Sequence, residues 1–299
     1  MTTNQSEPQQ NNNFQPPKAT FPAQHQNIQP GHEYIMQPRP ISEDPAYVGS
    51  GKLKNKSVII TGGDSGIGRA VAYTFAKEGA CITIAYLNET QDAEETKNKI
   101  TELGGKCILV PGDLRNESHC LAVINETIKT FGTLDVLINN HAVQFPQKSI
   151  LDITAEQLET TFQTNIFSFF YMVKASLPHM QKNSSIINTA SVTAYKGEPI
   201  LIDYSATKGA IISFTRSLSL SLETMKIRVN AVAPGPIWTP LIPASFKAEK
   251  VQTFGANTPM GRAGQPFELA PAYVYLASND SLYVSGQVLH VNGGTIIQS

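Results

Sequence analysis

Short runs of β-branched and other apolar residues recur along the chain after residue 50, and they alternate with longer segments of helical periodicity. Each run is apolar almost throughout, so a strand formed by it needs cover on both faces. Strands of this kind that are joined by helices form a parallel sheet with right-handed crossovers. We therefore predict an α/β protein whose single domain holds a doubly wound, seven-stranded parallel sheet with helices on both faces. The predicted strands are Val58–Thr61, Cys81–Tyr86, Lys106–Val110, Leu134–Ile138, Ser185–Thr189, Ile227–Val232 and Gln287–Val291.

The segments between these strands have the spacing of apolar residues that is typical of helices. The most apolar run, Ile166–Val173, stops at Lys174 and is much shorter than the roughly 20 residues that span a bilayer. We therefore expect helices that cover the sheet, and no membrane partner. The predicted helices are Ala70–Lys77, Glu94–Leu103, Glu117–Phe131, Ala155–Met180, Tyr204–Leu222 and Pro266–Ala277.

The first part of the chain has a different composition. Residues 1–45 hold eight of the 19 prolines together with eight glutamines and five asparagines, and they have almost no aliphatic periodicity. A segment of this composition does not bury enough apolar surface to form a core of its own. We predict an irregular or disordered arm over residues 1–48 and one folded domain over residues 49–299.

The charge and cysteine content exclude several classes of function. The 299 residues carry 23 Lys and Arg against 24 Asp and Glu, so no basic field attracts nucleic acid. The three cysteines, Cys81, Cys107 and Cys120, have no spacing typical of a zinc site or a disulfide framework. The first 30 residues lack the apolar segment of a secretory signal. We expect a cytoplasmic protein with no metal site and no nucleic-acid partner.

A glycine-rich segment, Thr61–Gly68, directly follows the first predicted strand and precedes a helix. Glycines in such a turn let the backbone approach a pyrophosphate, and the helix N-terminus receives the phosphate charge. A P-loop has similar glycine spacing, but Arg69 and Ala70 stand where it requires Lys and then Ser or Thr. The turn therefore favours a dinucleotide site over a phosphoryl-transfer site.

The end of the second strand in a dinucleotide site supplies a residue for the adenosine ribose. An acid there binds the 2′-hydroxyl of NAD, whereas a basic group binds the 2′-phosphate of NADP. Here the sequence is Tyr86-Leu87-Asn88, which carries neither charge. The choice between NAD and NADP stays open on this evidence.

The sequence contains two Tyr-x-x-x-Lys patterns. Tyr73 and Lys77 lie on the first predicted helix, and we interpret them as a contact on its surface. Tyr204 and Lys208 instead follow Ser191, which comes just after a predicted strand, where doubly wound sheets bind their ligands. An ammonium one helical turn away lowers the pKa of a phenol, so Tyr204 is a candidate acid or base and Ser191 can orient a carbonyl or hydroxyl.

With the glycine-rich turn and this trio in order, the chain resembles the classical short-chain dehydrogenase/reductase family over residues 52–299. Within the family, its long N-terminal segment resembles that of a bacterial subgroup with an extended arm. Asn139-Asn140 begins a segment that is similar to the family's Asn-Asn-Ala-Gly motif, but His141 and Ala142 stand in place of its Ala-Gly. We interpret His141 as structural. The other matching residues are Asp113 in Gly112–Leu114, Asn139-Asn140, Asn165, the segment Ile227–Thr239 and Asn292–Gly294.

The resemblance implies a Rossmann-type fold and an NAD(P)-dependent oxidoreductase that transfers hydride between nicotinamide and a secondary alcohol or carbonyl compound. Tyr204 is then the general acid or base, and the other implied catalytic residues are Asn165, Ser191 and Lys208. The alternative is a catalytically silent dinucleotide-binding sensor or interaction protein, because a fold alone does not establish activity. The residues implied to bind NAD or NADP are Gly62, Asp64, Ser65, Gly66, Ile67, Gly68, Tyr86, Asp113, Leu114, Asn139, Tyr204, Lys208, Pro234, Gly235, Ile237 and Thr239.

The family carries a mobile substrate lid after the nicotinamide-binding turn, which here corresponds to about residues 239–262. The apolar residues in and around this segment indicate one of two roles. They form an apolar wall of the substrate site, or they pack the lid itself or a contact with another subunit. Three residues, Gln144, Thr193 and Glu198, are candidates for polar selectivity. The apolar candidates are Trp238, Leu241, Ile242, Phe246, Phe254 and Met260.

The resemblance also implies an assembly of identical subunits. Family members are usually dimers or tetramers, and we expect a homotetramer that acts on a small-molecule alcohol or carbonyl substrate. Apolar residues in the arm lead to a further hypothesis, that part of the arm is anchored on another subunit. These residues are Phe21, Ile28, Tyr34, Ile35 and Met36.

Overall fold

The computed structural model describes residues 20–296. Its strands form one sheet in the order β3-β2-β1-β4-β5-β6-β7, and every neighbouring pair is parallel. The predicted α/β class and the seven-stranded parallel sheet are thus confirmed. The strand order reverses between β1 and β4, and ligands of doubly wound sheets bind beyond the carboxyl ends of the strands at such a point. The strands are β1 Ser57–Thr61, β2 Cys81–Tyr86, β3 Lys106–Pro111, β4 Leu134–Asn139, β5 Met180–Thr189, β6 Arg228–Pro234 and β7 Val288–Val291.

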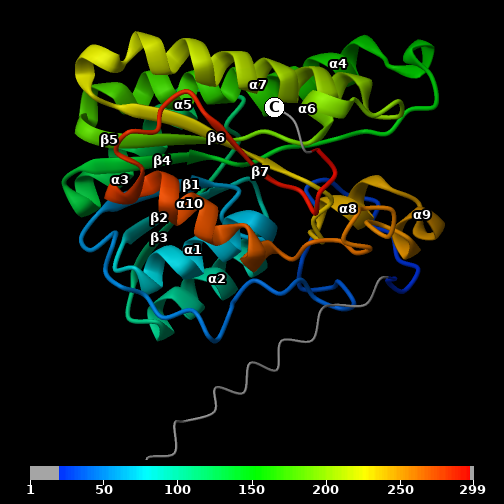
Figure 1. Cartoon of the computed structure of the whole chain (residues 1–299), viewed down its shortest axis with the longest axis horizontal. Helices are drawn as coiled ribbons and strands as arrows, with labels where there is room; N and C mark the ends of the chain where they lie inside the picture. The colour runs from blue at the N-terminus through cyan, green and yellow to red at the C-terminus, as the bar shows by residue number, and fades with distance from the viewer. Residues whose placement is uncertain (1–19, 297–299) are drawn as a thin grey trace, which may run out of the picture.

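Helices cover both faces of the sheet. One layer contains α1, α2 and α10, and the other contains α3, α5 and α7, while α8 and α9 lie at one end of the sheet (Figure 1). No helix within residues 20–296 is long and apolar enough to cross a membrane. The helices are α1 Gly66–Lys77, α2 Thr90–Glu102, α3 Glu117–Phe131, α4 Ala155–Phe162, α5 Ser168–Ser176, α6 Thr193–Lys196, α7 Ile202–Ser221, α8 Leu241–Ser245, α9 Ala248–Gln252 and α10 Ala270–Ala277.

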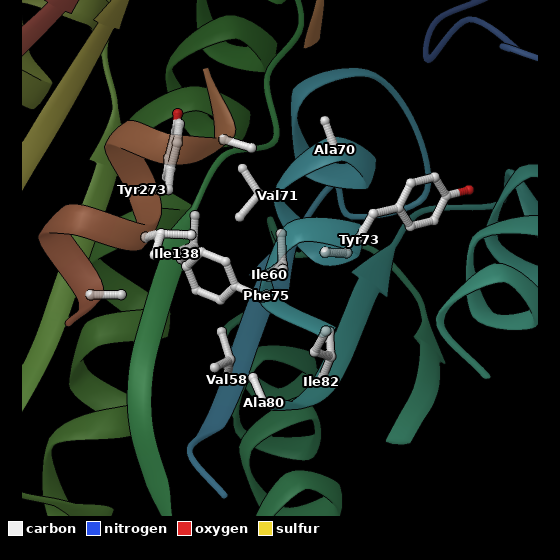
Figure 2. Close-up of a cluster of buried hydrophobic side chains, with 14 of the residues drawn as sticks. Val58, Ile60, Ala70, Val71, Tyr73, Phe75, Ala80, Ile82, Ile138 and Tyr273 are labelled. Atoms are coloured by element: carbon white, nitrogen blue, oxygen red, sulfur yellow. The ribbon is translucent and has the colours of Figure 1, made fainter. Parts of the chain in front are cut away.

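The central strand β1 shows how the sequence forms the core. All five of its residues are buried, and their side chains alternate between the two helix layers. Val58 and Ile60 pack with α1 and α10, where Phe75 and Tyr273 contribute aromatic rings, as Figure 2 shows. Ile59 packs in the opposite layer with α3 and α5. Cover on both faces explains why this strand is apolar without a break.

The helix predicted over Ala155–Met180 is confirmed as one uninterrupted helical run over 155–179, but the expectation of a plain α-helix that ends at Met180 is wrong. The structure divides this segment into α4, a π-helical turn over Gln163–Phe167, α5 and a 3-10 turn, and Met180 already belongs to β5. Pro178 lies in the 3-10 turn, because proline cannot continue the hydrogen-bond ladder of an α-helix. Apolar periodicity alone could not separate the helix from the start of the strand.

The interpretation of Tyr73 and Lys77 as a surface contact is also wrong. The Tyr73 side chain is buried in the core between α1 and the sheet. Lys77 is directed to the N-terminal arm, where its Nζ donates to the Asp44 carbonyl at 2.9 Å and pairs with Glu43 at 3.0 Å. The two residues therefore have separate structural roles.

The described part of the N-terminal arm, residues 20–48, contains no helix or strand but packs on the domain. Figure 1 shows this segment in blue, running from beside α8 and α9 towards β1. Phe21 stacks on Trp238 with ring centroids 3.8 Å apart, and Met36 is buried in the same cluster. These two residues are thus anchored on their own chain rather than on another subunit, whereas residues 1–19 lie outside the described part.

Candidate active site

The glycine-rich turn between β1 and α1 has the conformation expected of a phosphate-binding turn. Gly62 and Gly66 have φ values of +62° and +52°, which favour glycine. A Cβ on Gly68 would lie 2.0 Å from the Gly62 carbonyl oxygen, so glycine is required there for close packing of the helix on the strand. The helix α1 begins at Gly66, four residues before the predicted start, and its N-terminus is part of the turn.

A cavity of 370 Å³ lies over this turn. It extends from the end of β2 at Tyr86 to the start of the lid at Thr239, so it has the elongated lining that a dinucleotide needs. Asn140, rather than the predicted Asn139, lines it. The predicted cofactor residues among its walls are Gly62, Asp64, Ser65, Gly66, Ile67, Tyr86, Asp113, Leu114 and Thr239.

The end of this cavity near β2 is acidic. Asp64 and Glu89 both line it, and each is only 3% exposed. Burial raises the pKa of Asp64 to about 7, and the nearby Glu89 carboxylate adds to that rise. Arg115 is the only Lys or Arg among the described residues lining this cavity, and its Nη2 donates to Asp113 at 2.6 Å. This pairing lowers the pKa of the Asp113 carboxyl.

Glu89 is a candidate site residue that was not predicted from the sequence. The segment expected to contact the ribose, Tyr86-Leu87-Asn88, ends one residue before this carboxylate. A usable signal existed, because the ribose-binding acid of a dinucleotide fold stands about 20 residues after the glycine-rich turn. Glu89 is at that separation from Gly68.

A second cavity of 510 Å³ adjoins the first. The two share lining residues, among them Ile67, Asn140 and Thr239, so they are continuous in space. Ser191, Tyr204 and Lys208 converge on the second cavity, as the sequence predicts. Its walls also contain the predicted cofactor residues Pro234, Gly235 and Ile237.

Each member of the trio is fixed by its local structure. Ser191 follows β5, and its Oγ accepts hydrogen bonds from the Thr193 backbone and side chain, both at 3.1 Å. Tyr204 and Lys208 occupy successive turns of α7, which puts them on one face of the helix. The Lys208 Nζ donates to the carbonyl of Thr189, the last residue of β5, at 2.8 Å and lies 5.5 Å from the centre of the Tyr204 ring.

Burial governs the protonation of Tyr204 and Lys208. It raises the pKa of Tyr204 to about 12, and a hydrogen bond with Ser191 opposes that rise. Burial also lowers the pKa of Lys208 to about 7, so this side chain readily loses its charge. Burial therefore opposes the expected lowering of the tyrosine pKa by the ammonium, because it disfavours the charged forms of both side chains.

Three predicted site residues do not line either cavity, and all three are buried within the framework. Gly68 packs α1 on β1, as described above. The Asn139 Nδ2 donates to Asn188 Oδ1 at 3.0 Å across the sheet. The Asn165 amide accepts from the Val143 backbone amide and donates to the Val143 carbonyl, both at 2.9 Å, from the π-helical turn. Such turns widen a helix locally and are frequent at functional sites.

His141 is held on both ring nitrogens. Its Nδ1 lies 2.7 Å from Thr61 Oγ1, and its Nε2 lies 2.9 Å from Ser168 Oγ. Burial lowers the pKa of His141 to about 3, so the ring stays neutral at physiological pH. These contacts tie the loop after β4 to β1 and α5, in agreement with a structural role.

The sequence profile described as Enoyl-(Acyl carrier protein) reductase matches residues 62–295, which include the glycine-rich turn from Gly62 onward, the whole lining of the second cavity and the trio. The chain belongs to the classical short-chain dehydrogenase/reductase family. A solved member described as a short-chain dehydrogenase/reductase, glucose/ribitol dehydrogenase, from Brucella melitensis superposes with a TM-score of 0.75 at 30% identity, covering 83% of this chain and 99% of that one.

Two members of the family have higher sequence identity to this chain. The Bacillus subtilis (strain 168) protein named uncharacterized oxidoreductase YhxC is 62% identical over 94% of this chain and 98% of its own length. The Arabidopsis thaliana protein named NADPH-dependent aldehyde reductase 1, chloroplastic, is 51% identical over 92% of this chain and 98% of its own length. Both matches extend across nearly the whole of either chain.

The lid of this short-chain dehydrogenase/reductase has an apolar inner face. Four of the six apolar candidates line the second cavity, together with the polar candidates Gln144, Thr193 and Glu198. Trp238 is instead fully buried against the arm, and Met260 is 69% exposed. The wall and the packing interpretations are therefore each correct for different residues. Those that line the cavity are Leu241, Ile242, Phe246 and Phe254.

The arm supplies two residues to the site that sequence reasoning missed. Gln29 lines the first cavity, and Glu33 is buried at the N-terminus of α1. The Glu33 carboxylate accepts from the Gly66 backbone amide at 2.6 Å, whereas the N-cap residue Ser65 makes no side-chain capping bond. Nothing in the local sequence around Gln29 or Glu33 indicates contacts with residues so distant along the chain.

Proposed function

We propose that this oxidoreductase transfers hydride between a nicotinamide dinucleotide and a secondary alcohol or carbonyl compound. The observation that carries the proposal is the convergence of Ser191, Tyr204 and Lys208 on a cavity that is continuous with the one over the glycine-rich turn. A phenol beside a hydroxyl at the wall of a cavity can exchange a proton with a substrate oxygen. A catalytically silent sensor has no need of this arrangement.

The residues at the turn fit a dinucleotide. The left-handed conformation of Gly62 and Gly66 and the close packing at Gly68 bring the start of α1 to the wall of the first cavity, which extends to the acidic pocket at β2. When bound, the nicotinamide supplies the hydride acceptor or donor. Pro234, Gly235, Ile237 and Thr239 line the part of the second cavity proposed for this ring.

The protein side of the reaction is a proton transfer. In the reductive direction, we propose that the Tyr204 Oη gives its proton to the substrate oxygen and that the Ser191 hydroxyl orients this oxygen. Lys208, held at the Thr189 carbonyl, stabilises the tyrosinate that results. Asn165 acts on α7 from outside the cavity, because its Nδ2 donates to Thr207 Oγ1 at 3.2 Å.

The experiment that tests this function is a titration of the purified protein with NADH and NADPH, followed by a turnover assay. Binding is followed by nucleotide fluorescence and by energy transfer from Trp238, whose neighbours Ile237 and Thr239 line the second cavity. The assay uses a panel of aldehydes, ketones, sugars and polyols. Saturable binding with turnover supports the proposal, whereas saturable binding with no turnover on any substrate favours the silent sensor.

The acidic pocket leads to a proposal on cofactor choice, namely that the protein prefers NAD(H). Asp64 and Glu89 stand where a ribose 2′-hydroxyl can donate to a carboxylate, and a 2′-phosphate there meets two acids. Arg115, the only Lys or Arg in the lining among the described residues, is already bonded to Asp113. We expect the Kd for NADH to be lower than that for NADPH by roughly tenfold or more, which corresponds to about 1.4 kcal/mol.

The double variant Asp64→Asn with Glu89→Gln removes both carboxyl groups and tests this preference. We expect the ratio of the two Kd values, measured by calorimetry, to fall to within about threefold, chiefly through tighter NADPH binding. Glu94→Gln is the control, because Glu94 is exposed on α2. A wild-type protein that binds NADPH as tightly as NADH contradicts the preference.

The predicted homotetramer remains a proposal, and exposed apolar side chains support it. Phe167 and Phe170 are 45% and 47% exposed, and Phe170 lies against Phe214 of α7 with ring centroids 4.3 Å apart. Apolar surface on neighbouring helices is typical of a subunit contact. Sedimentation velocity of the full chain is expected to show one tetrameric species, and a monomer across the micromolar range contradicts it.

A further inference from the structure

The N-terminal arm is bonded directly to the lid of the second cavity. Its backbone amide at Phe21 donates to the Gln252 carbonyl of α9 at 3.0 Å, and that at Gln26 donates to the Pro243 carbonyl of α8 at 2.8 Å. The arm therefore follows both lid helices in turn. A lid held by a second segment at several points is less free to open than one joined to the domain only by its own ends.

The same arm also forms part of the wall of the first cavity. Gln29, Pro30 and Gly31 line it together with residues of the glycine-rich turn. The fit is tight, because a Cβ on Gly31 would lie 2.6 Å from the Pro240 carbonyl oxygen and 2.8 Å from the Ala244 Cβ. The arm and the start of α8 thus close this side of the cavity together.

Gln29 joins three segments through one side-chain amide. Its Nε2 donates to the Gln144 carbonyl at 2.6 Å, and its Oε1 accepts from the Gln144 backbone amide at 3.1 Å. The same Nε2 lies 3.4 Å from the Ala244 carbonyl of α8. Gln144 lines the second cavity, so this amide ties the arm to the loop after β4 at the junction of the two cavities.

Three further contacts, all made by Glu33, hold the arm on the far side of Gln29. Glu33 pairs with Arg69 at 2.7 Å and accepts from Gly66 at the N-terminus of α1. The backbone amide of Glu33 donates to Asp92 of α2 at 2.7 Å. Gln29 therefore lies in a segment fixed at both ends, one end on the lid and the other on the glycine-rich turn.

We propose that Gln29 is a positioning residue of the nucleotide site, which holds the arm closed over the bound dinucleotide and thereby slows its release. This proposal rests on the proposed function, because it requires a dinucleotide in the first cavity. The Gln29 amide acts through Gln144 and α8 rather than on the reacting atoms. Opening of this wall then precedes dissociation of the nucleotide.

The test is the dissociation rate of NADH from the full-length chain, measured by stopped-flow displacement with excess NAD⁺. In Gln29→Ala, both hydrogen bonds with Gln144 are lost, and we expect NADH to dissociate about tenfold faster. Gln24→Ala is the matched control, because Gln24 lies in the same arm and its side chain bonds only to Pro22 and Gln37, also in the arm. Its dissociation rate is expected to stay within twofold of the wild-type rate.

A dissociation rate for Gln29→Ala within twofold of wild type overturns the proposal, and so does an equal rise in both variants. Gly31→Ala provides a second route, because the added methyl group pushes the arm away from Pro240 and Ala244 without removing an amide. It is expected to accelerate release in the same direction. Failure of the wild-type protein to bind NADH or NADPH overturns the proposed function itself, which keeps the two failures distinct.

Discussion

Tyr204→Phe is expected to lower kcat by roughly 10³-fold, within the range that a positioned acid or base contributes. The substitution removes only the phenolic oxygen, and the ring keeps its buried position on α7. Nucleotide binding is expected to change by less than about threefold, because the ring still lines the second cavity and the first cavity is unaltered. The measurements are steady-state kinetics on whichever substrate the panel identifies and a calorimetric titration with NADH.

The second Tyr-x-x-x-Lys pattern supplies a matched control for that variant. Tyr73 is also a buried tyrosine on a helix with a lysine one turn later, but it lies in the core between α1 and the sheet. Tyr73→Phe is expected to leave kcat within about twofold of wild type. If Tyr204→Phe retains wild-type turnover, the proposed proton transfer is wrong; if both variants lose activity equally, the loss reflects damage to the fold.

Arg69→Ala is expected to cause a large loss of thermal stability. The Arg69 side chain is 2% exposed and pairs with Glu33 at 2.7 Å and Asp92 at 3.1 Å. It also donates from Nε to the Asp64 carbonyl at 2.9 Å. Its removal leaves the buried Asp92 without its cation and the buried Glu33 with only Arg39, at 3.6 Å, which costs about 3–5 kcal/mol. We expect the thermal midpoint, measured by differential scanning calorimetry, to fall by about 10 °C.

A control variant distinguishes the effect of breaking this buried ion pair from that of losing a surface charge. Arg39 belongs to the same charge cluster, but its side chain is 39% exposed and pairs chiefly with Glu95. Arg39→Ala is therefore expected to change stability by less than about 1 kcal/mol. An equal loss of stability in both variants contradicts the role given to the buried pair.

The pH dependence of the Arg69→Ala deficit has a definite sign. Burial already raises the pKa of Glu33 in the wild-type protein, although Arg69 and the Gly66 amide both oppose this rise. Without Arg69 the folded-state pKa moves further above the unfolded value, so the folded variant binds a proton more readily as the pH falls. The loss of stability relative to wild type is therefore expected to be smaller at pH 5 than at pH 8.

The sheet was accessible from the sequence because its signal is local and strong. A strand such as β1 that is covered on both faces must be apolar throughout, and the pattern identifies it within a residue of its true ends. The segment after Ala155 was not accessible in this way. Its division into α4, a π-helical turn and α5 accompanies hydrogen bonds between Asn165 and Val143, a contact across 22 residues that no periodicity reveals.

Only part of the candidate site was likewise predictable from the sequence. Ser191, Tyr204 and Lys208 were predictable because their separations fix them on the end of one strand and on one face of one helix. The protonation of the trio was not predictable, since spacing puts the ammonium near the phenol but says nothing of how deeply both are buried. The contacts of Gln29 and Glu33 were not predictable, because their partners are distant in the sequence and come near only through the path of the arm over the domain.

That path also constrains the order in which the molecule is made. Translation delivers the arm first, yet its anchors lie on segments that leave the ribosome much later: Phe21 binds Gln252, and Ile41 receives a hydrogen bond from Phe267. Contacts across more than 200 residues form slowly, because a long loop must close before they contribute. The arm therefore cannot make these two contacts until residues 252 and 267 have been synthesised. Incomplete chains that end before Gln252 lack the contact that holds the arm on α9.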